Sequence, residues 1–545
     1  MSTSNKLASS SSVFNTPELL VLICKFLEAE ECVPLLTASQ ACFPIAASRV
    51  WAQVDNARVL LALLGVKITG DGSYEAIKNH PHISLYGTRN FKRFEFYAPL
   101  VRHLNVYGNE CHHFKISNWY TLFQQARKGP LLPNLSSLTL NAADSIFAVD
   151  QMLWISIFAS PSLLRFKPIH IRDSNKACVS ELAAAIILKT ISDRCPNMQS
   201  LYIYPTRENG EGDTDGESCL LNIMWPGPYL PYLQSLLGLR SLSTSLAVID
   251  GDGLPALGGL PQLETLTIRG CNEYLHDENF AVPANSFPRL MSLTLWEIYV
   301  GVVRDLMAIQ PLVRRLTHLS ICHWFEEEEA EEQTEWFEGT IPLLLQNIPG
   351  LESLYYDATY NISPFDFDIV RGGISHSFLE RTSKLRTLYL TGFEIQSVGV
   401  LECMPASWSM LTDLCLVHGV ISPALLPYFA KLPNLQKLTL QLQFSHRVDW
   451  PVFDGGRGTG LTLHTIVNTE NRVELDAGVA ASDIARCFLS LWPNLSFVDW
   501  PAVYGSSLLG SILPSRQLLV EINAWIRNAS RESVVAQGDV EMAQT

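Results

Sequence analysis

The most constraining feature of this chain is a triplet of apolar residues, spaced Leu-x-x-Leu-x-Leu, that recurs along most of its length. A short unit of this kind cannot bury its apolar face alone, so successive copies must pack side by side around one continuous core. The stack presents a long surface of equivalent positions, which favours recognition of a partner over catalysis. Clear copies of the triplet are Leu135/Leu138/Leu140, Leu263/Leu266/Ile268, Leu290/Leu293/Leu295, Leu316/Leu319/Ile321, Leu385/Leu388/Leu390, Leu411/Leu414/Leu416 and Leu435/Leu438/Leu440.

The interval between copies predicts the class of repeat. The middle leucines at 266, 293 and 319 are separated by 27 and 26 residues. This interval resembles that of leucine-rich repeats, which span about 20–29 residues. We therefore predict an α/β fold, a leucine-rich-repeat solenoid over residues 95–515, with parallel strands on its concave face and helices behind.

The segments between triplets predict how each repeat is completed. Apolar stretches predict helices that pack behind the strands, at 300–309, 340–346 and 425–432. Pro-Asn pairs mark the turns that lead into strands, at 133–134, 196–197, 433–434 and 493–494.

The two ends of the chain differ from the repeats in composition. Residues 1–12 are Ser-rich, and we predict that they and the tail 529–545 are disordered. Residues 516–528 carry Leu, Ile and Trp on one helical face, which predicts a helix that caps the last repeat.

Composition excludes several classes of protein. Of the 545 residues 47% are apolar and 17% charged, as in a folded chain, and the net charge of −15 disfavours a nucleic-acid binder or docking to anionic membranes. The same negative charge favours a partner with a basic surface. No apolar run is long enough to span a membrane, and no secretory signal is evident, so we predict a cytoplasmic or nuclear protein with reduced cysteines.

The sequence offers no pattern typical of catalysis, metal or cofactor binding. Cys111, His112 and His113 are metal-ligand types, but no Cys-x-x-Cys pair exists to complete a structural zinc site. Phosphate-binding glycine loops and the nucleophile elbow Gly-x-Ser-x-Gly are also absent from the sequence. We predict that the chain is not an enzyme and needs no cofactor.

The outward positions of the predicted strands are the candidate substrate-binding residues. Exposed aromatic side chains on a concave sheet are typical anchors of protein interfaces. The alternative is that the longer loops fold over these positions and bury them. The candidates are Tyr202, Tyr204, Thr267, Arg269, Trp296, Tyr355, Asp357, Tyr389 and Thr391.

A small helical module precedes the repeats, over residues 13–65. Thr16 and Pro17 begin an amphipathic helix that runs to Leu27, with further helices predicted near Glu30, over 43–51 and near Val59. The segment 13–54, with its Pro-Glu-Leu-Leu start and the pair Val50-Trp51, resembles an F-box and looks most like those of fungal F-box proteins with leucine-rich repeats.

That resemblance implies a role as substrate receptor of a ubiquitin ligase. F-box helices dock on the Skp-type adaptor of a cullin–RING ligase, while the repeats hold a protein substrate. By this resemblance the residues that contribute to the adaptor contact or its supporting core are Pro17, Leu19, Leu20, Ile23, Leu27, Val33 and Leu36.

The sequence is also compatible with three alternatives. The N-terminal helices could simply cap the first repeat, since fifty residues rich in Leu, Ile and Phe cannot bury all their apolar surface alone. The chain could be a repeat scaffold or inhibitor without a ligase, or an enzyme whose site has no recognised motif.

Overall fold

The computed structural model of the chain describes residues 16–65, 68–69, 82–85, 91–108, 114–142, 148–170, 177–206, 229–270, 282–324, 336, 341–357, 372–395, 397–442, 462–467, 481–493, 495, 498–499 and 520–528. The chain forms two compact units. Unit 1 comprises Met1–Asp277 with Ser286–Arg289, and unit 2 comprises Glu278–Asn285 with Leu290–Thr545. The termini 1–12 and 529–545, and residues 516–519 of the predicted cap, lie outside the described residues.

Unit 1 is built on a ladder of parallel strands in the order β1-β4-β6-β7-β9-β11-β12. Its middle apolar residues lie in register from strand to strand: Val54, Leu104, Leu138, Phe166, Leu201, Leu242 and Leu266. The strands are β1 (Gln53–Val54), β4 (His103–Asn105), β6 (Ser137–Ala142), β7 (Arg165–His170), β9 (Ser200–Ile203), β11 (Ser241–Ser245) and β12 (Thr265–Arg269).

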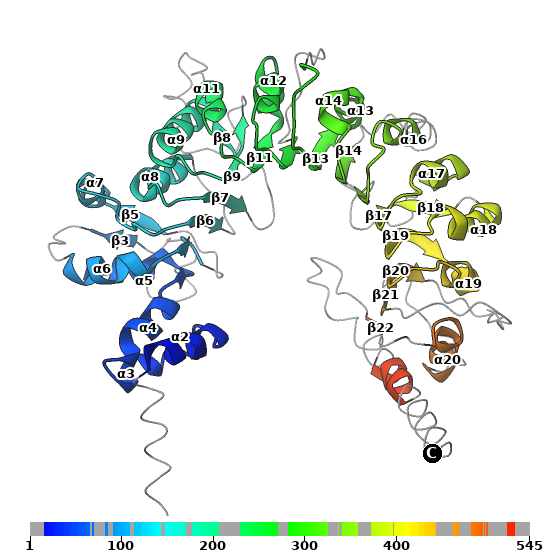
Figure 1. Ribbon diagram of the computed structural model, residues 1–545, viewed down its shortest axis with the longest axis horizontal. Helices are drawn as coiled ribbons and strands as arrows, with labels where there is room; N and C mark the ends of the chain where they lie inside the picture. The colour runs from blue at the N-terminus through cyan, green and yellow to red at the C-terminus, as the bar shows by residue number, and fades with distance from the viewer. Residues whose placement is uncertain are drawn as a thin grey trace, which may run out of the picture. The chain divides into compact units, whose positions relative to one another are not determined.

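The helices of unit 1 lie along one side of this ladder and, for the three nearest the N-terminus, at its end (Figure 1). They are α2 (Pro17–Phe26), α3 (Leu35–Ala38), α4 (Cys42–Val50), α5 (Ala57–Ala62), α6 (Lys92–Tyr97), η2 (Ala98–Leu100), α7 (Tyr120–Ala126), α8 (Ala148–Phe158), α9 (Glu181–Arg194), α11 (Tyr229–Gln234), η4 (Leu246–Ile249) and α12 (Gly253–Gly258). Small side sheets pair β2 (Ile68–Thr69), β3 (His82–Ser84) and β5 (Lys115–Ser117), and β8 (Val179–Ser180) with β10 (Pro205–Thr206).

Unit 2 repeats the same plan, with parallel strands in the order β13-β14-β15-β17-β19-β20-β21-β22. The middle leucines again lie in register: Leu293, Leu319, Leu354, Leu388, Leu414, Leu438 and Leu463. The strands are β13 (Ser292–Tyr299), β14 (His318–Trp324), β15 (Ser353–Asp357), β17 (Thr387–Thr391), β19 (Asp413–Ile421), β20 (Lys437–Leu442), β21 (Thr462–Val467) and β22 (Val498–Asp499).

The helices of unit 2 also follow their strands along one side of the ladder (Figure 1). They are α13 (Val300–Ala308), α14 (Gln310–Val313), α16 (Ile341–Leu345), α17 (His376–Arg381), α18 (Val398–Ser407), η6 (Pro423–Leu425), α19 (Leu426–Ala430) and α20 (Ala481–Leu491). A side pair joins β16 (Gly372–Ile374) to β18 (Phe393–Ile395).

The stacking of one parallel strand per leucine triplet, predicted from the sequence, is therefore confirmed within each unit. The core lies between strands and helices, where leucines such as Leu266 and Leu388 are fully buried. Two details of the prediction were wrong. The ladder begins at β1, inside the segment assigned to the helical module, and residues 29–34 form turns, so the second helix begins at Leu35 rather than near Glu30.

The Pro-Asn turns join each repeat to the preceding one. The side-chain amide of Asn134 donates a hydrogen bond to the Pro99 carbonyl at 2.7 Å, and Asn434 donates one to the Ser409 carbonyl at 2.7 Å. Asn197 donates similarly to the Pro161 carbonyl. Each of these acceptors lies shortly before the strand of the preceding repeat, so asparagine satisfies a backbone carbonyl that the strand ladder leaves unpaired.

Replacement of Asn434 tests how much this hydrogen bond between repeats contributes to stability. Asn434→Ala removes the donor to Ser409 and should lower the free energy of unfolding by about 1 kcal/mol. Chemical denaturation followed by circular dichroism measures the loss, with Gln436→Ala, at an exposed position two residues on, as the control. An equal effect of the two substitutions would contradict a specific role for the turn asparagine.

A helix at 520–528 (red in Figure 1) packs against the last described strand of unit 2. Its Ile522 and Ile526 are buried. The Asn523 side chain accepts a hydrogen bond from the Val498 backbone N–H at 2.8 Å and donates one to the Val498 carbonyl at 2.7 Å. One amide side chain thus pairs with both backbone groups of a residue in β22, as a further strand would.

Candidate functional site

The N-terminal helices share a core built largely of cysteine and alanine. Leu20, Cys24, Cys32 and Cys42 are buried in it, together with alanines of α4. The Arg49 guanidinium donates to the Leu27 carbonyl at 3.3 and 3.2 Å and so ties α4 to the end of α2. Because this core is small, it covers only one side of α2.

The opposite side of α2 and the turn after it expose large apolar side chains. We call this set the α2 patch: Leu19, Val21, Leu22, Ile23, Phe26 and Val33, which are 39–86% exposed. Phe26 is the most exposed of them, at 86%. Soluble proteins rarely leave so many large apolar groups together in water unless a partner covers them.

The other side of the module is attached to the repeats through α4. The ring of Trp51 stacks on that of Tyr97 with centroids 4.5 Å apart, and Phe43 lies 6.0 Å from Phe96. The chain then continues directly into β1, whose Val54 is in register with Leu104. The helices therefore do cap the first repeat, but they do so through α4, and this contact leaves the α2 patch uncovered.

The residues predicted for adaptor binding divide into three groups by their exposure. Leu20 is buried and belongs to the core of the module, while Leu27 and Leu36 are half-buried. Pro17, Leu19, Ile23 and Val33 are exposed. Sequence reasoning did not select Val21, Leu22 and Phe26, because amphipathic spacing places apolar residues on a face without showing which part of that face the core covers.

The strand face of unit 1, defined as the sheet face opposite the helices, carries Tyr202 between basic residues. The Lys167 ammonium lies 5.0 Å from the centroid of the Tyr202 ring. The Arg269 guanidinium lies 5.4 Å from the ring of Tyr204, whose hydroxyl is 2.8 Å from that of Ser243. Tyr202, Thr267 and Arg269 are half-buried, so the predicted site residues of this unit surround one strip of the face.

Tyr204 corrects the prediction of an exposed aromatic anchor. Its side chain is only 3% exposed and packs with Ala177, Cys178 and Tyr202. Alternation along β9 gives the face to which Tyr204 belongs but not what lies over it. Tyr204 therefore supports Arg269 from below and is not itself a contact residue.

His103 lies on the same face of the sheet, near two arginine side chains. Its pKa is lowered by burial and by the nearby guanidinium groups of Arg165 and Arg102. The sequence singled out none of these residues, nor Lys167, because the triplet of β7 reduces to Leu163 and Phe166.

The lowered pKa of His103 predicts a pH-dependent stability. Below about pH 6.5, His103 binds a proton more readily in the unfolded chain than in the folded one, because its pKa is lower in the folded state. The free energy of unfolding should therefore fall as the pH falls from about 6.5 to 5. His103→Gln should make this slope shallower, and Arg165→Gln should do so in part because it removes a repelling charge. Denaturation midpoints measured across this range test both, and an unchanged slope in His103→Gln contradicts the assignment.

The strand face of unit 2 holds the aromatic and acidic candidates. Tyr355 and Tyr389, in register on β15 and β17, stack with centroids 4.3 Å apart and planes 13° apart. Burial and the adjacent Asp357 raise the pKa of Tyr355, so its phenol stays protonated and lies 3.5 Å from the Asp357 carboxylate as a donor.

Trp296 lies on the same face, beside a bulge that sequence reasoning did not foresee. The ladder of β13 and β14 shifts register between Trp296 and Ile298, and Glu297, between them, has a φ of 59°. The Trp296 indole donates to the Glu297 carboxylate at 3.0 Å. Thr391 is 3% exposed, so its predicted role as an accessible contact is wrong, while Trp296, Tyr355, Asp357 and Tyr389 are half-buried.

Within the described residues, no three His, Cys, Asp or Glu side chains lie close enough together to hold a metal ion. The candidate cluster Cys111, His112 and His113 lies outside the described residues. In the same part of the chain no helix has the length and apolar character needed to cross a bilayer.

The chain matches no protein-family model, and no curated protein matches its sequence. Among solved structures, it is similar to an internalin from Listeria monocytogenes at 12% identity and a TM-score of 0.28, over 85% of this chain and 95% of that one. It is similar to the TLR13–ssRNA13 complex at 14% identity and a TM-score of 0.34, over 77% of this chain and 57% of that one.

A third match, at 11% identity and a TM-score of 0.25, is the complex of Toll and Spatzle from Drosophila, over 70% of this chain and 45% of that one. The repeat architecture described above rests on the strand pairing of this chain and not on these distant similarities.

Proposed function

We propose that this chain is the substrate-recognition subunit of a cullin–RING ubiquitin ligase. The α2 patch binds a Skp-type adaptor, which links the chain to a cullin, and the strand faces of the repeats bind a protein substrate. The observation that carries the proposal is the α2 patch, which remains exposed although α4 already attaches the module to the repeats.

The proposed mechanism is proximity. The repeats hold a substrate while the N-terminal helices hold the ligase, so ubiquitin transfer to the substrate becomes effectively intramolecular. The chain itself then contributes binding and positioning but no catalytic residue. This role places the protein in the cytosol or the nucleus, where such ligases act.

Binding of the full-length chain to a purified Skp-type adaptor, bound to the amino-terminal region of its cullin, tests the proposal. Calorimetry should show a complex of one chain per adaptor, with an established F-box protein as the positive control. If the control binds and this chain does not, the ligase role fails, and the chain is then better described as a repeat scaffold or inhibitor.

A further inference from the structure

The strand face of unit 1 reverses the overall charge of the chain. The whole sequence has 39 basic and 54 acidic residues. The outward positions of β6, β7, β9, β11 and β12 carry Arg165, Lys167 and Arg269 but no Asp or Glu, and the rest are mainly hydroxyl-bearing side chains. A face with this composition is complementary to negative charge.

Two of these cations are held against the sheet by tyrosine rings. Lys167 lies over Tyr202 and Arg269 over Tyr204, at 5.0 and 5.4 Å from the ring centroids. Such contacts fix a cation without neutralising it. Within the described residues, neither Lys167 nor Arg269 forms an ion pair with a carboxylate.

Arg269 also has a donor that the described residues leave unused. Its Nε atom is buried and has no hydrogen-bond acceptor in the described part of the chain. A buried donor without an acceptor destabilises a protein, and more so when the group is charged. A carboxylate placed beside the guanidinium would satisfy this donor and pair the charge in one step.

The spacing of the two cations suits an extended peptide. Lys167 lies on β7 and Arg269 on β12, with β9 and β11 between them. Three strand spacings of about 4.8 Å separate the two residues by about 14 Å, which is the length of about four residues of extended chain. A nucleic acid would require a denser and longer track of cations, because its affinity comes from many phosphate contacts.

We propose that the strip from Lys167 through Tyr202 to Arg269 binds an acidic segment of a partner protein. The segment lies extended across the strands, with carboxylates about four residues apart. This rests on the proposed function and specifies the class of substrate. It also replaces the basic partner that the net charge alone favoured.

Fluorescence anisotropy with the full-length chain tests this assignment. The probe is a fluorescein-labelled ten-residue oligoglutamate, compared with a ten-residue oligoglutamine and a ten-nucleotide oligothymidylate. The wild type should bind oligoglutamate at least about tenfold more tightly than oligoglutamine, and the affinity should fall with added salt. Lys167→Gln/Arg269→Gln should weaken oligoglutamate binding by about tenfold or more, while Lys167→Arg/Arg269→Lys should retain most of it.

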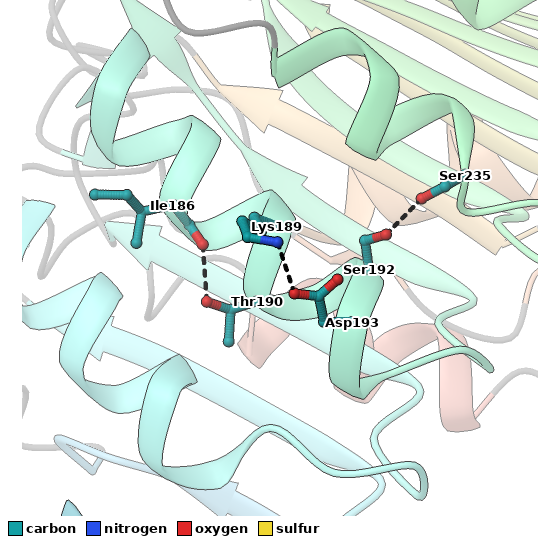
Figure 2. A network of polar contacts seen from close by, with 6 residues as sticks. All are labelled: Ile186, Lys189, Thr190, Ser192, Asp193 and Ser235. Atoms are coloured by element: carbon teal, nitrogen blue, oxygen red, sulfur yellow. Dashed lines mark hydrogen bonds and ion pairs between the residues drawn. The ribbon is translucent and has the colours of Figure 1, made fainter.

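Lys189 provides a matched control for the loss of a cation over a tyrosine. It lies 5.5 Å from the Tyr232 ring centroid in the same unit, but on α9. It forms an ion pair with Asp193, one turn along that helix, at 2.9 Å, and Figure 2 shows the two side chains facing each other. Lys189→Gln changes the net charge as either single substitution of the strip does, and it should leave oligoglutamate binding unchanged.

Four results would overturn the assignment, and the first three are equal affinity for oligoglutamate and oligoglutamine, unchanged binding by a folded double variant, and an equal loss in Lys189→Gln. Tighter binding of oligothymidylate, lost in the double variant, would assign the strip to nucleic acid instead. A variant of the α2 patch, Phe26→Asp, should bind oligoglutamate normally. If the wild-type chain binds oligoglutamate but does not bind the adaptor, the ligase role fails while the assignment of this strip to an acidic segment stands.

Discussion

Replacement of Phe26 by aspartate should abolish most of the binding to a Skp-type adaptor while leaving the fold intact. Phe26 is 86% exposed on α2, so a carboxylate there faces water in the free chain and costs little stability. In the complex it would be buried without a partner. Large aromatic anchors at interfaces commonly contribute 2–4 kcal/mol, so the affinity should fall by about 100-fold or more.

Titration calorimetry with the adaptor measures this effect, and thermal unfolding checks the fold. The matched control is Leu237→Asp, an apolar-to-acidic substitution at a position that is 62% exposed in the turn after α11. It should bind the adaptor as the wild type does. If Phe26→Asp also binds as tightly as the wild type, the α2 patch is not the adaptor site.

The largest loss of stability is expected from Trp408, which joins two successive repeats of unit 2. The indole follows α18, is fully buried and donates to the Thr382 hydroxyl at 2.8 Å. Thr382, which follows α17, in turn donates to the Phe378 carbonyl at 2.7 Å. Trp408→Ala should lower the free energy of unfolding by about 3–5 kcal/mol through lost packing and the cavity left behind.

Two milder variants separate the packing of Trp408 from its hydrogen bond. Trp408→Phe keeps most of the apolar volume and removes the hydrogen bond to Thr382, and loss of that bond should lower the free energy of unfolding by about 1 kcal/mol. Thr382→Val leaves a buried indole N–H without its acceptor and should lower the free energy of unfolding by about 1–3 kcal/mol. Chemical denaturation followed by far-ultraviolet circular dichroism compares the three. Hydrogen exchange should show the largest loss of protection in the repeats of α17 and α18, and uniform loss over the chain would contradict a local role.

The leucine triplet predicted the strand ladder well because each copy specifies one strand by itself and the same pattern recurs in every repeat. Leu266, Leu293 and Leu388 each needed only alternation to be placed in the core, and every neighbouring copy imposed the same register. The side sheets, such as β8 with β10, were not predictable in this way. They join short segments of unlike sequence, and nothing in their composition marks a strand.

The candidate sites were only partly predictable, for a related reason. Alternation placed Tyr204 on the same side of the chain as Tyr202, but the burial of Tyr204 depends on Ala177 and Cys178, which precede α9. The basic strip was missed because it joins residues of different repeats, with Lys167 in a degenerate copy and Arg269 in a clear one. Charge on a repeat surface is assembled across strands, whereas sequence patterns run along them.

The amide of Asn523 bears on whether copies of this molecule can join through the edge of the strand ladder. A parallel ladder has two open edges, and an exposed edge strand can recruit a strand from another copy. Such contacts join the tail of one copy to the head of the next and, if they do not close into a ring, build fibres. By occupying both backbone groups of Val498, one asparagine side chain blocks that growth at β22 and favours dispersed molecules over polymers.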